Sequence, residues 1–217
     1  MASSKGSLPK RERAPRMTSD ARRHEILRCA LRAFSRANYM RVTIADLARE
    51  AGISEPALYK HFASKKDLFL TLVSYIGDRM IETWREIAAE ASSPADALRA
   101  IGARHFVKAL RNKDYTVVMF QAISEVADED VRRTLRDVYR RYVDFIEALL
   151  ADSKRRGLAP AHLDARIIAW NIVALGFSLN LVAAIDLDVD LLSDNLAKWG
   201  GPVFEYIQPV NGGGNHP

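Results

Sequence analysis

Five side chains that can bind nucleic acid stand close together between residues 55 and 65. Lys60 can donate to guanine O6 or N7 or to a phosphate, and Tyr59 offers a hydroxyl donor. Glu55 can accept from a cytosine amino group or cap a helix, and His61 can bind or simply pack. Lys65 lies in the first turn of a predicted helix, where its charge and the free backbone N–H groups together favour a phosphate oxygen.

These side chains need a rigid support, and residues 43–62, TIADLAREAGISEPALYKHF, predict two short helices joined by a tight turn. In the first helix, apolar residues recur with helical spacing. Thr43 caps this helix in a capping box with Asp46. Gly52 then supplies the turn, because glycine takes a left-handed conformation without steric cost.

The second helix of the pair is predicted to carry the binding side chains. Ser54 caps it, and Pro56 falls in its first turn, where a missing N–H costs nothing. Leu58 and Phe62 give it an inner face, which leaves residues 55–60 largely outward. Such a helix fits the major groove of DNA, although an ordinary pair of solvated helices has the same pattern.

The distribution of charge favours a nucleic-acid partner for the N-terminal third. The chain carries a net charge of +5, and residues 1–70 hold fifteen Lys or Arg against seven Asp or Glu. The remainder is slightly acidic. A basic patch attracts the phosphate backbone and releases its counterions, so we expect this third to meet DNA, with a merely solvated basic face as the alternative.

Composition indicates a soluble globular chain. The 217 residues are 48% hydrophobic, which is enough for a sizeable core. The polar, basic first eighteen residues lack the pattern of a secretory signal, so we expect a cytoplasmic protein. The single cysteine, Cys29, lies on an apolar helical face and is expected to be buried.

Residues 1–18 are predicted to be a disordered basic arm that either lies in the minor groove or is an inert tail. A first helix over residues 20–37 is expected to brace the two short helices. Ser64 and Asp67 form a second capping box, which opens a long helix with leucine and isoleucine at steps of four.

At this point the sequence resembles the tetracycline-repressor-like (TetR) family of transcriptional regulators. The resemblance covers residues 20–70 and lies in Thr43, Ile44, Ala45, Ala51-Gly52-Ile53-Ser54, Leu58-Tyr59-Lys60-His61-Phe62 and Ser64-Lys65…Leu68. One position departs from the commonest pattern. Pro56 stands where many members have glycine, as it does in the tetracycline repressors, so the sequence preference on DNA stays open.

The resemblance implies an all-α homodimer with one DNA-reading head per subunit and a larger C-terminal helical domain for ligand binding and dimerisation. It also implies roles for particular residues. Positions matching Thr43, Tyr59, His61 and Lys65 typically hold phosphates, and those matching Glu55, Pro56, Ala57 and Lys60 face the bases. Ser54, at the start of the reading helix, completes the predicted DNA-binding set.

Beyond residue 70 only periodicity guides the prediction. Helices are expected over about 93–112 and 114–126, followed by a helix in which apolar residues from Val131 to Leu149 form a heptad-like seam. Residues 167–185 carry no charge and are long enough for a membrane span. Their asparagines would be costly in lipid, so we expect no membrane contact and a helix buried between the core and a partner.

We therefore predict homodimerisation through helices near 163–185 and 189–207. The predicted domains are an arm at 1–18, a helix-turn-helix domain at 19–66, an effector-binding and dimerisation domain at 67–207, and a disordered tail at 208–217. A pocket for a small apolar or amphipathic effector is expected among aromatic and polar residues of the central helices, although plain core packing is the alternative for each. The candidates are Trp84, His105, Phe106, Tyr115, Met119, Phe120, Gln121, Trp170 and Asn171.

Enzymatic and metal chemistry are not expected. The histidines have no Cys, Asp or Glu partners at metal-ligand spacing, and no nucleophile motif or phosphate-binding glycine loop occurs. The sequence predicts no cofactor and no metal. The leading hypothesis is a repressor that a small effector releases from a double-stranded DNA operator. The alternative is a structural DNA-associated or protein-partnered regulator that uses the same head and has no small effector.

Overall fold

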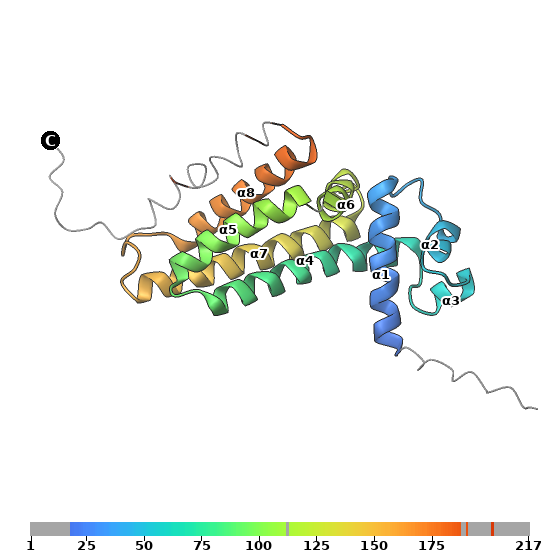
Figure 1. Ribbon diagram of the computed structural model, residues 1–217, viewed down its shortest axis with the longest axis horizontal. Coiled ribbons are helices and arrows are strands. Elements are labelled where there is room, and N and C mark those ends of the chain that lie inside the picture. The colour runs from blue at the N-terminus through green and yellow to red at the C-terminus, as the bar shows by residue number, and fades with distance from the viewer. Residues whose placement is uncertain (1–17, 112, 188–189, 191–200, 202–217) are drawn as a thin grey trace, which may run out of the picture.

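The computed structural model describes residues 18–111, 113–187, 190 and 201, and this part of the chain is all-helical. Figure 1 shows a small head on the right joined to an elongated bundle by one long helix. The head holds α1 (Ser19–Arg36), α2 (Ile44–Glu50) and α3 (Glu55–Tyr59), and α4 (Lys65–Glu90) runs from it into the bundle. The bundle adds α5 (Pro94–Arg111), α6 (Lys113–Ser124), α7 (Glu129–Arg155) and α8 (Ala165–Ala184).

Several helices begin at a residue whose side chain caps the first turn, as predicted for Ser64. The Ser64 hydroxyl accepts from the Asp67 backbone N–H at 3.0 Å to start α4, and Ser93 does the same for Asp96 at 3.1 Å ahead of α5. Asp128 caps α7 through the backbone N–H groups of Asp130 and Val131. Side-chain caps of this kind satisfy backbone donors that have no partner within the helix.

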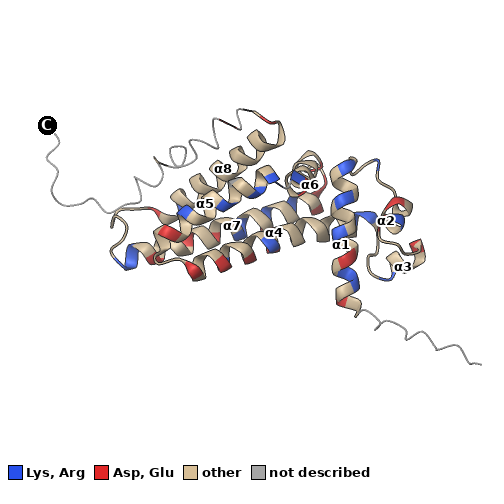
Figure 2. Ribbon diagram, in the orientation of Figure 1, with Lys and Arg blue, Asp and Glu red and all other residues tan. Residues whose placement is uncertain are grey.

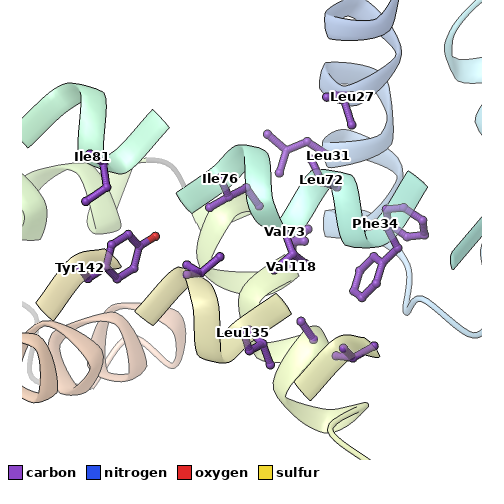
Figure 3. Close-up of a cluster of buried hydrophobic side chains, with 14 of the residues drawn as sticks. Leu27, Leu31, Phe34, Leu72, Val73, Ile76, Ile81, Val118, Leu135 and Tyr142 are labelled. Carbon is purple, nitrogen blue, oxygen red and sulfur yellow. The ribbon is translucent and has the colours of Figure 1, made fainter. Parts of the chain in front are cut away.

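A single cluster of buried side chains joins the head to the bundle. Figure 3 shows Leu31 and Phe34 of α1 beside Leu72 and Val73 of α4, with Val118 of α6 close by. The cluster continues along α4 and α7. The predicted seam of α7 is buried from Val131 to Tyr142, whereas Phe145 and Leu149 are only partly buried, and Val143, Ile146 and Leu150 are the buried residues there. Cys29 is buried as expected. The head and the bundle therefore share one core.

The seam helices α4 and α7 approach most closely at Gly77. A Cβ placed on Gly77 would lie 2.9 Å from a methyl carbon of Val138, which is fully buried. We expect Gly77→Ala to destabilise the fold by about 1 kcal/mol, because overpacking of about 1–3 kcal/mol outweighs the gain of about 1 kcal/mol in helix propensity. Thermal unfolding followed by circular dichroism measures the change.

Gly102→Ala is the matched control, since a Cβ there meets nothing within 4 Å. This change in α5 should raise the unfolding temperature through helix propensity alone. A rise of equal size for both variants would show that the two helices can separate at no cost.

The last described helix, α8, leaves one apolar face uncovered. Of the described helices it alone is long and apolar enough to cross a membrane, with mean hydropathy 1.9, and only 28% of that stretch is buried. Asn171 and Ser178 lie on the exposed side, and polar side chains there would be costly in lipid. The predictions for the arm at 1–18 (apart from residue 18), the helix at 189–207 (apart from residues 190 and 201) and the tail at 208–217 fall outside the described residues.

Candidate functional site

The two short helices of the head form the predicted helix-turn-helix geometry. The Thr43 hydroxyl accepts from the Asp46 backbone N–H at 3.1 Å, and Asp46 in return accepts from the Thr43 backbone N–H at 3.0 Å. The Thr43 hydroxyl also donates to the Asp46 carboxylate at 2.6 Å, and this bond, together with the one from the Thr43 backbone N–H, lowers the pKa of the Asp46 carboxyl. Gly52 has a φ of +62°, the left-handed conformation that favours glycine. Ser54 then caps α3 by accepting from the Ala57 backbone N–H at 3.3 Å.

Most of the predicted DNA-binding side chains lie on the open surface of this motif. Thr43, Ser54, Glu55, Pro56, Tyr59 and Lys60 are exposed, and Ala57 and His61 are half-buried. Tyr59 is 50% exposed, which is high for a large aromatic side chain. Leu58 and Phe62 are buried beneath them and fix the helix to the head. The exposed set is thus presented on one rigid support.

Lys65 occupies a different place from the rest of the set. Its ammonium group donates to the backbone carbonyls of Tyr39 at 2.9 Å and Val42 at 3.1 Å, and it lies 4.6 Å from the centre of the Tyr39 ring. These contacts tie the start of α4 to the loop between α1 and α2. An ammonium group has three protons, so one remains for a phosphate oxygen.

Arg23 fixes the end of the reading helix from the side of α1. Its guanidinium donates to the His61 backbone carbonyl and lies 4.2 Å from the centre of the Phe62 ring. Figure 2 shows Lys and Arg along α1 and near α2, while the first residue of α3, Glu55, is acidic. The head therefore combines basic flanks with a nearly uncharged reading helix.

A large cavity lies inside the bundle, enclosed by α4, α5, α6, α7 and α8. Its volume is about 680 Å³, which is in the range of pockets that hold drug-sized ligands. Aliphatic and aromatic side chains make up most of the wall. Five of the nine predicted pocket residues line it, namely Trp84, His105, Tyr115, Met119 and Phe120.

The other four predicted pocket residues are not among the lining. Trp170 and Asn171 are exposed on the outer face of α8, with Trp170 at 47%. Gln121 points from α6 toward the head. Phe106 belongs to α5, and its side chain lies outside the described part. Adjacent residues on a helix point about 100° apart, so Phe120 and Gln121 lie on different faces of α6.

Sequence reasoning missed two tyrosines of α7 that line the cavity. Tyr142 stacks at a tilt on Trp84 with ring centres 5.1 Å apart, and Tyr139 meets Tyr142 edge to face at 5.6 Å. Burial raises the pKa of Tyr139 to about 12 and raises that of Tyr142 as well. Both phenols stay protonated and can donate hydrogen bonds. The heptad spacing of α7 placed Tyr142 among the residues that pack between helices. That spacing does not distinguish a residue in a filled core from one that lines a cavity.

Gln121 connects the cavity helix to the head. Its amide nitrogen donates to the Phe34 backbone carbonyl at 2.7 Å, and its amide oxygen accepts from the Tyr39 backbone N–H at 3.0 Å. The first bond satisfies a carbonyl in the last turn of α1, where such groups lack helical partners. One side chain of α6 thus holds the turn that leads from α1 to α2.

A second link between the parts is ionic. The Lys66 ammonium lies 2.7 Å from a carboxylate oxygen of Asp128 and 2.7 Å from one of Asp130, at the start of α7. Hydrogen bonds to Lys66 lower the pKa of both carboxyls. Because these groups are partly exposed, the pairs orient the helices more than they stabilise them.

A helix-turn-helix head on a helical bundle with an internal cavity defines a DNA-binding transcriptional regulator. The chain belongs to the TetR family of such regulators. Residues 26–72 match the bacterial regulatory proteins of the tetR family, and residues 76–177 match the C-terminal region of YsiA-like proteins. Members of this family are regulators and not enzymes.

Individual relatives agree with this assignment. The nucleoid occlusion factor SlmA of Sodalis glossinidius is 28% identical over 158 residues, which cover 72% of this chain and 80% of that protein. A TetR-family regulator from Agrobacterium tumefaciens has a TM-score of 0.70 at 25% identity, over 87% of this chain and 98% of that one. The fold is also similar to that of the transcriptional regulator FadR of Bacillus subtilis, solved with stearoyl-CoA, with a TM-score of 0.73 at 17% identity, over 85% of this chain and 99% of that one.

Proposed function

We propose that this protein is a transcriptional repressor that a small apolar or amphipathic effector releases from its operator. The observation that carries the proposal is the position of α6. One face of this helix lines the cavity with Met119 and Phe120, and another face holds the head through Gln121. A ligand that moves the cavity-facing side chains of α6 would also move Gln121 and, through it, the head.

The release mechanism requires that the effector binds two conformations unequally. In the DNA-bound dimer the two heads must match successive major grooves, about 34–36 Å apart. An effector that prefers a different spacing shifts the population away from the operator-bound form. The complex of Bacillus subtilis FadR with stearoyl-CoA supports an elongated amphipathic ligand for a bundle of this shape.

We propose further that the exposed face of the head reads DNA as the family resemblance implies. Thr43, Tyr59, His61 and Lys65 would hold phosphates, and Glu55, Pro56, Ala57 and Lys60 would face the bases, with Ser54 at the start of the helix. The exposure of most of this set supports these roles. Residues 19–66 would form the DNA-binding domain and residues 67–207 the effector-binding and dimerisation domain, in a cytoplasmic protein.

Lys60 and Lys65 are expected to respond differently to removal of their charge. Lys60→Ala should leave the unfolding temperature unchanged, because the side chain is exposed. Lys65→Ala should weaken binding to all duplexes alike and lower the slope of log affinity against log salt by about one. It should also lower the unfolding temperature, since the Tyr39 and Val42 carbonyls lose their donor. Fluorescence anisotropy across a salt series and thermal unfolding measure both effects.

Lys65→Met is the matched control, because it keeps the apolar stem over the Tyr39 ring and removes only the charge and its hydrogen bonds. An unchanged salt slope in both Lys65 variants would assign Lys65 to the fold alone. Weaker binding restricted to particular base sequences would instead contradict a phosphate contact.

The uncovered face of α8 supports a homodimer. Ile167, Trp170, Leu181 and Ile185 are exposed and recur at helical spacing, with the small Ala174 between them. An apolar stripe of this length on a regulator that reads two half-sites is best covered by a second copy. The predicted second dimer helix, near 189–207, lies outside the described residues apart from 190 and 201.

Genomic footprinting of the purified protein tests the proposed function. Protected sites identify the operator, and repetition with stearoyl-CoA and with shorter amphipathic compounds tests release. A short set of protected promoters that a ligand clears would support a ligand-released repressor. Protection that no cavity-binding compound alters would contradict it.

A second function is a DNA-associated regulator that works through protein partners without a small effector. The match to a nucleoid occlusion factor over most of the chain favours it. The cavity of about 680 Å³ argues for the effector instead, because a filled core is expected where no ligand enters. Many dispersed footprints, insensitive to ligand, would favour this second function.

A further inference from the structure

The cavity wall carries a polar group that has lost its water and gained no partner. Both ring nitrogens of His105 are shielded from solvent, and neither makes a hydrogen bond within the part of the chain that the structure describes. The ring faces the α8 backbone at Gly176, where an added Cβ would lie 3.6 Å from Nε2. A buried donor or acceptor without a partner is unfavourable, so a partner for His105 would be strongly favoured.

The charge on His105 follows from its surroundings. Burial lowers the pKa of the imidazole, and the Lys108 ammonium on the next turn of α5 lowers it further. Hydrogen-bond contacts with the Gly176 backbone and the Asn180 side chain oppose the shift, although both contacts fall short of normal hydrogen-bond geometry. The ring is therefore neutral at pH 7 and offers one N–H donor and one nitrogen acceptor. Only a group that can pair with such a ring satisfies it.

The part of the wall that the structure describes carries no acidic side chain and, besides His105, one basic side chain. Among the described lining residues there is no Asp or Glu, and the only formal charge belongs to Arg99, which is exposed and lies 3.0 Å from Asp96. Lys108 is half-buried, and burial lowers the pKa of its ammonium. An ionised ligand group in this apolar space would lose its hydration without a paired charge, which is more costly than burying an uncharged group.

We propose that His105 is the polar anchor of the cavity and that it selects an elongated apolar ligand with one uncharged hydrogen-bonding group, such as a hydroxyl. The proposal rests on the proposed function, since it names the class of effector for the same cavity. The aliphatic and aromatic wall takes the chain, and the hydroxyl pairs with an imidazole nitrogen. The nearby Asn180 side chain, which also lines the cavity, is placed to meet the same hydroxyl.

Four ligands that share a ten-carbon chain and differ in the head group test this proposal without a change in chain length. Displacement of the fluorescent probe N-phenylnaphthylamine gives affinities of the full-length protein for n-decanol, n-chlorodecane, decanoate and decyltrimethylammonium. We expect n-decanol to bind about tenfold or more tightly than either ionic compound, because only the ionic heads lose hydration unpaired. Equal or tighter binding of decanoate or of the ammonium compound would overturn an uncharged head group.

The role of His105 is tested by His105→Leu, which removes both ring nitrogens and suits an apolar wall. This variant should weaken n-decanol about tenfold and leave n-chlorodecane unchanged, since only the hydroxyl loses its partner. His105→Asn retains a hydrogen-bonding side chain and should recover part of the affinity for n-decanol. His162→Leu, the same change at an exposed position, is the matched control and should change neither.

Each outcome decides one proposal. Equal losses for n-decanol and n-chlorodecane in His105→Leu would reveal a packing role and overturn the anchor, as would failure of every decyl compound to bind. Selective loss of n-decanol would support the anchor whether or not the ligand releases DNA. If n-decanol binds through His105 but leaves the operator complex intact, the anchor stands and the ligand-released repressor fails.

Discussion

Trp170→Glu is expected to convert the proposed dimer into monomers and to weaken operator binding about 100-fold or more. Trp170 is the largest side chain of the exposed stripe of α8, in its N-terminal half, so a carboxylate there would be buried against apolar side chains of the partner. Burial of an unpaired charge costs several kcal/mol, and about 2.8 kcal/mol already corresponds to a 100-fold change in affinity. A monomer also loses the second half-site. Analytical ultracentrifugation at micromolar concentration, with anisotropy on the footprinted operator, measures both effects.

Val126→Glu is the matched control for this prediction. Val126 follows α6 and is 40% exposed, close to the exposure of Trp170, but it does not belong to α8. Its replacement should leave the dimer intact. A dimer that persists in Trp170→Glu would mean that the exposed stripe of α8 is covered by something other than a second copy.

Gln121→Leu is expected to uncouple the cavity from the head. The variant leaves the Phe34 carbonyl and the Tyr39 N–H without their present partners, at about 1 kcal/mol each for partly buried groups. The unfolding temperature should fall by about 4–8 °C, from about 2–4 °C per kcal/mol at this chain length. A ligand such as n-decanol should still bind, but the ratio of operator affinities without and with ligand should approach one.

Ser124→Ala provides the comparison for Gln121→Leu. Ser124 is exposed on the same helix, and its hydroxyl donates to the Gln121 backbone carbonyl at 2.7 Å, so its loss leaves the link to the head in place. This variant should release DNA as the parent protein does. Full ligand-dependent release by Gln121→Leu would place the coupling elsewhere, with the ionic link through Lys66 as the next candidate.

The head could be predicted closely because its signals are local. The capping box at Thr43, the turn at Gly52 and the cap at Ser54 each depend on residues within four positions of one another, and all three form in the structure. The long-range contacts of the head could not be predicted in this way. Lys65 belongs to the family signature, yet no local pattern shows that its ammonium also binds the carbonyls of Tyr39 and Val42.

The cavity was predicted less well because its residues depend on the rotation of each helix about its axis. In α8 polar residues are few and lie on both sides, with Asn171 and Ser178 exposed and Asn180 in the cavity wall, so polarity does not define the outer side. Leu175 and Leu179 consequently line the cavity while Trp170 lies outside, although all three are large and apolar. Polarity alone also placed Gln121 in the pocket, whereas its amide is used by backbone groups 82 and 87 positions away.

In this fold, selection of the ligand and transmission of its binding to the head depend on different helices. Side chains from α5, α7 and α8, among them His105 and Tyr139, form walls that choose the ligand without touching the head. Among the described helices, α6 lines the cavity and binds the end of α1 through Gln121, and α4 also lines the cavity and packs against α1 through Phe69. Mutations of cavity residues on α5, α7 and α8 can therefore change which compound binds while α6 and its contact with the head stay unchanged. A biosensor built on this scaffold would vary α5, α7 and α8 and keep α6 fixed.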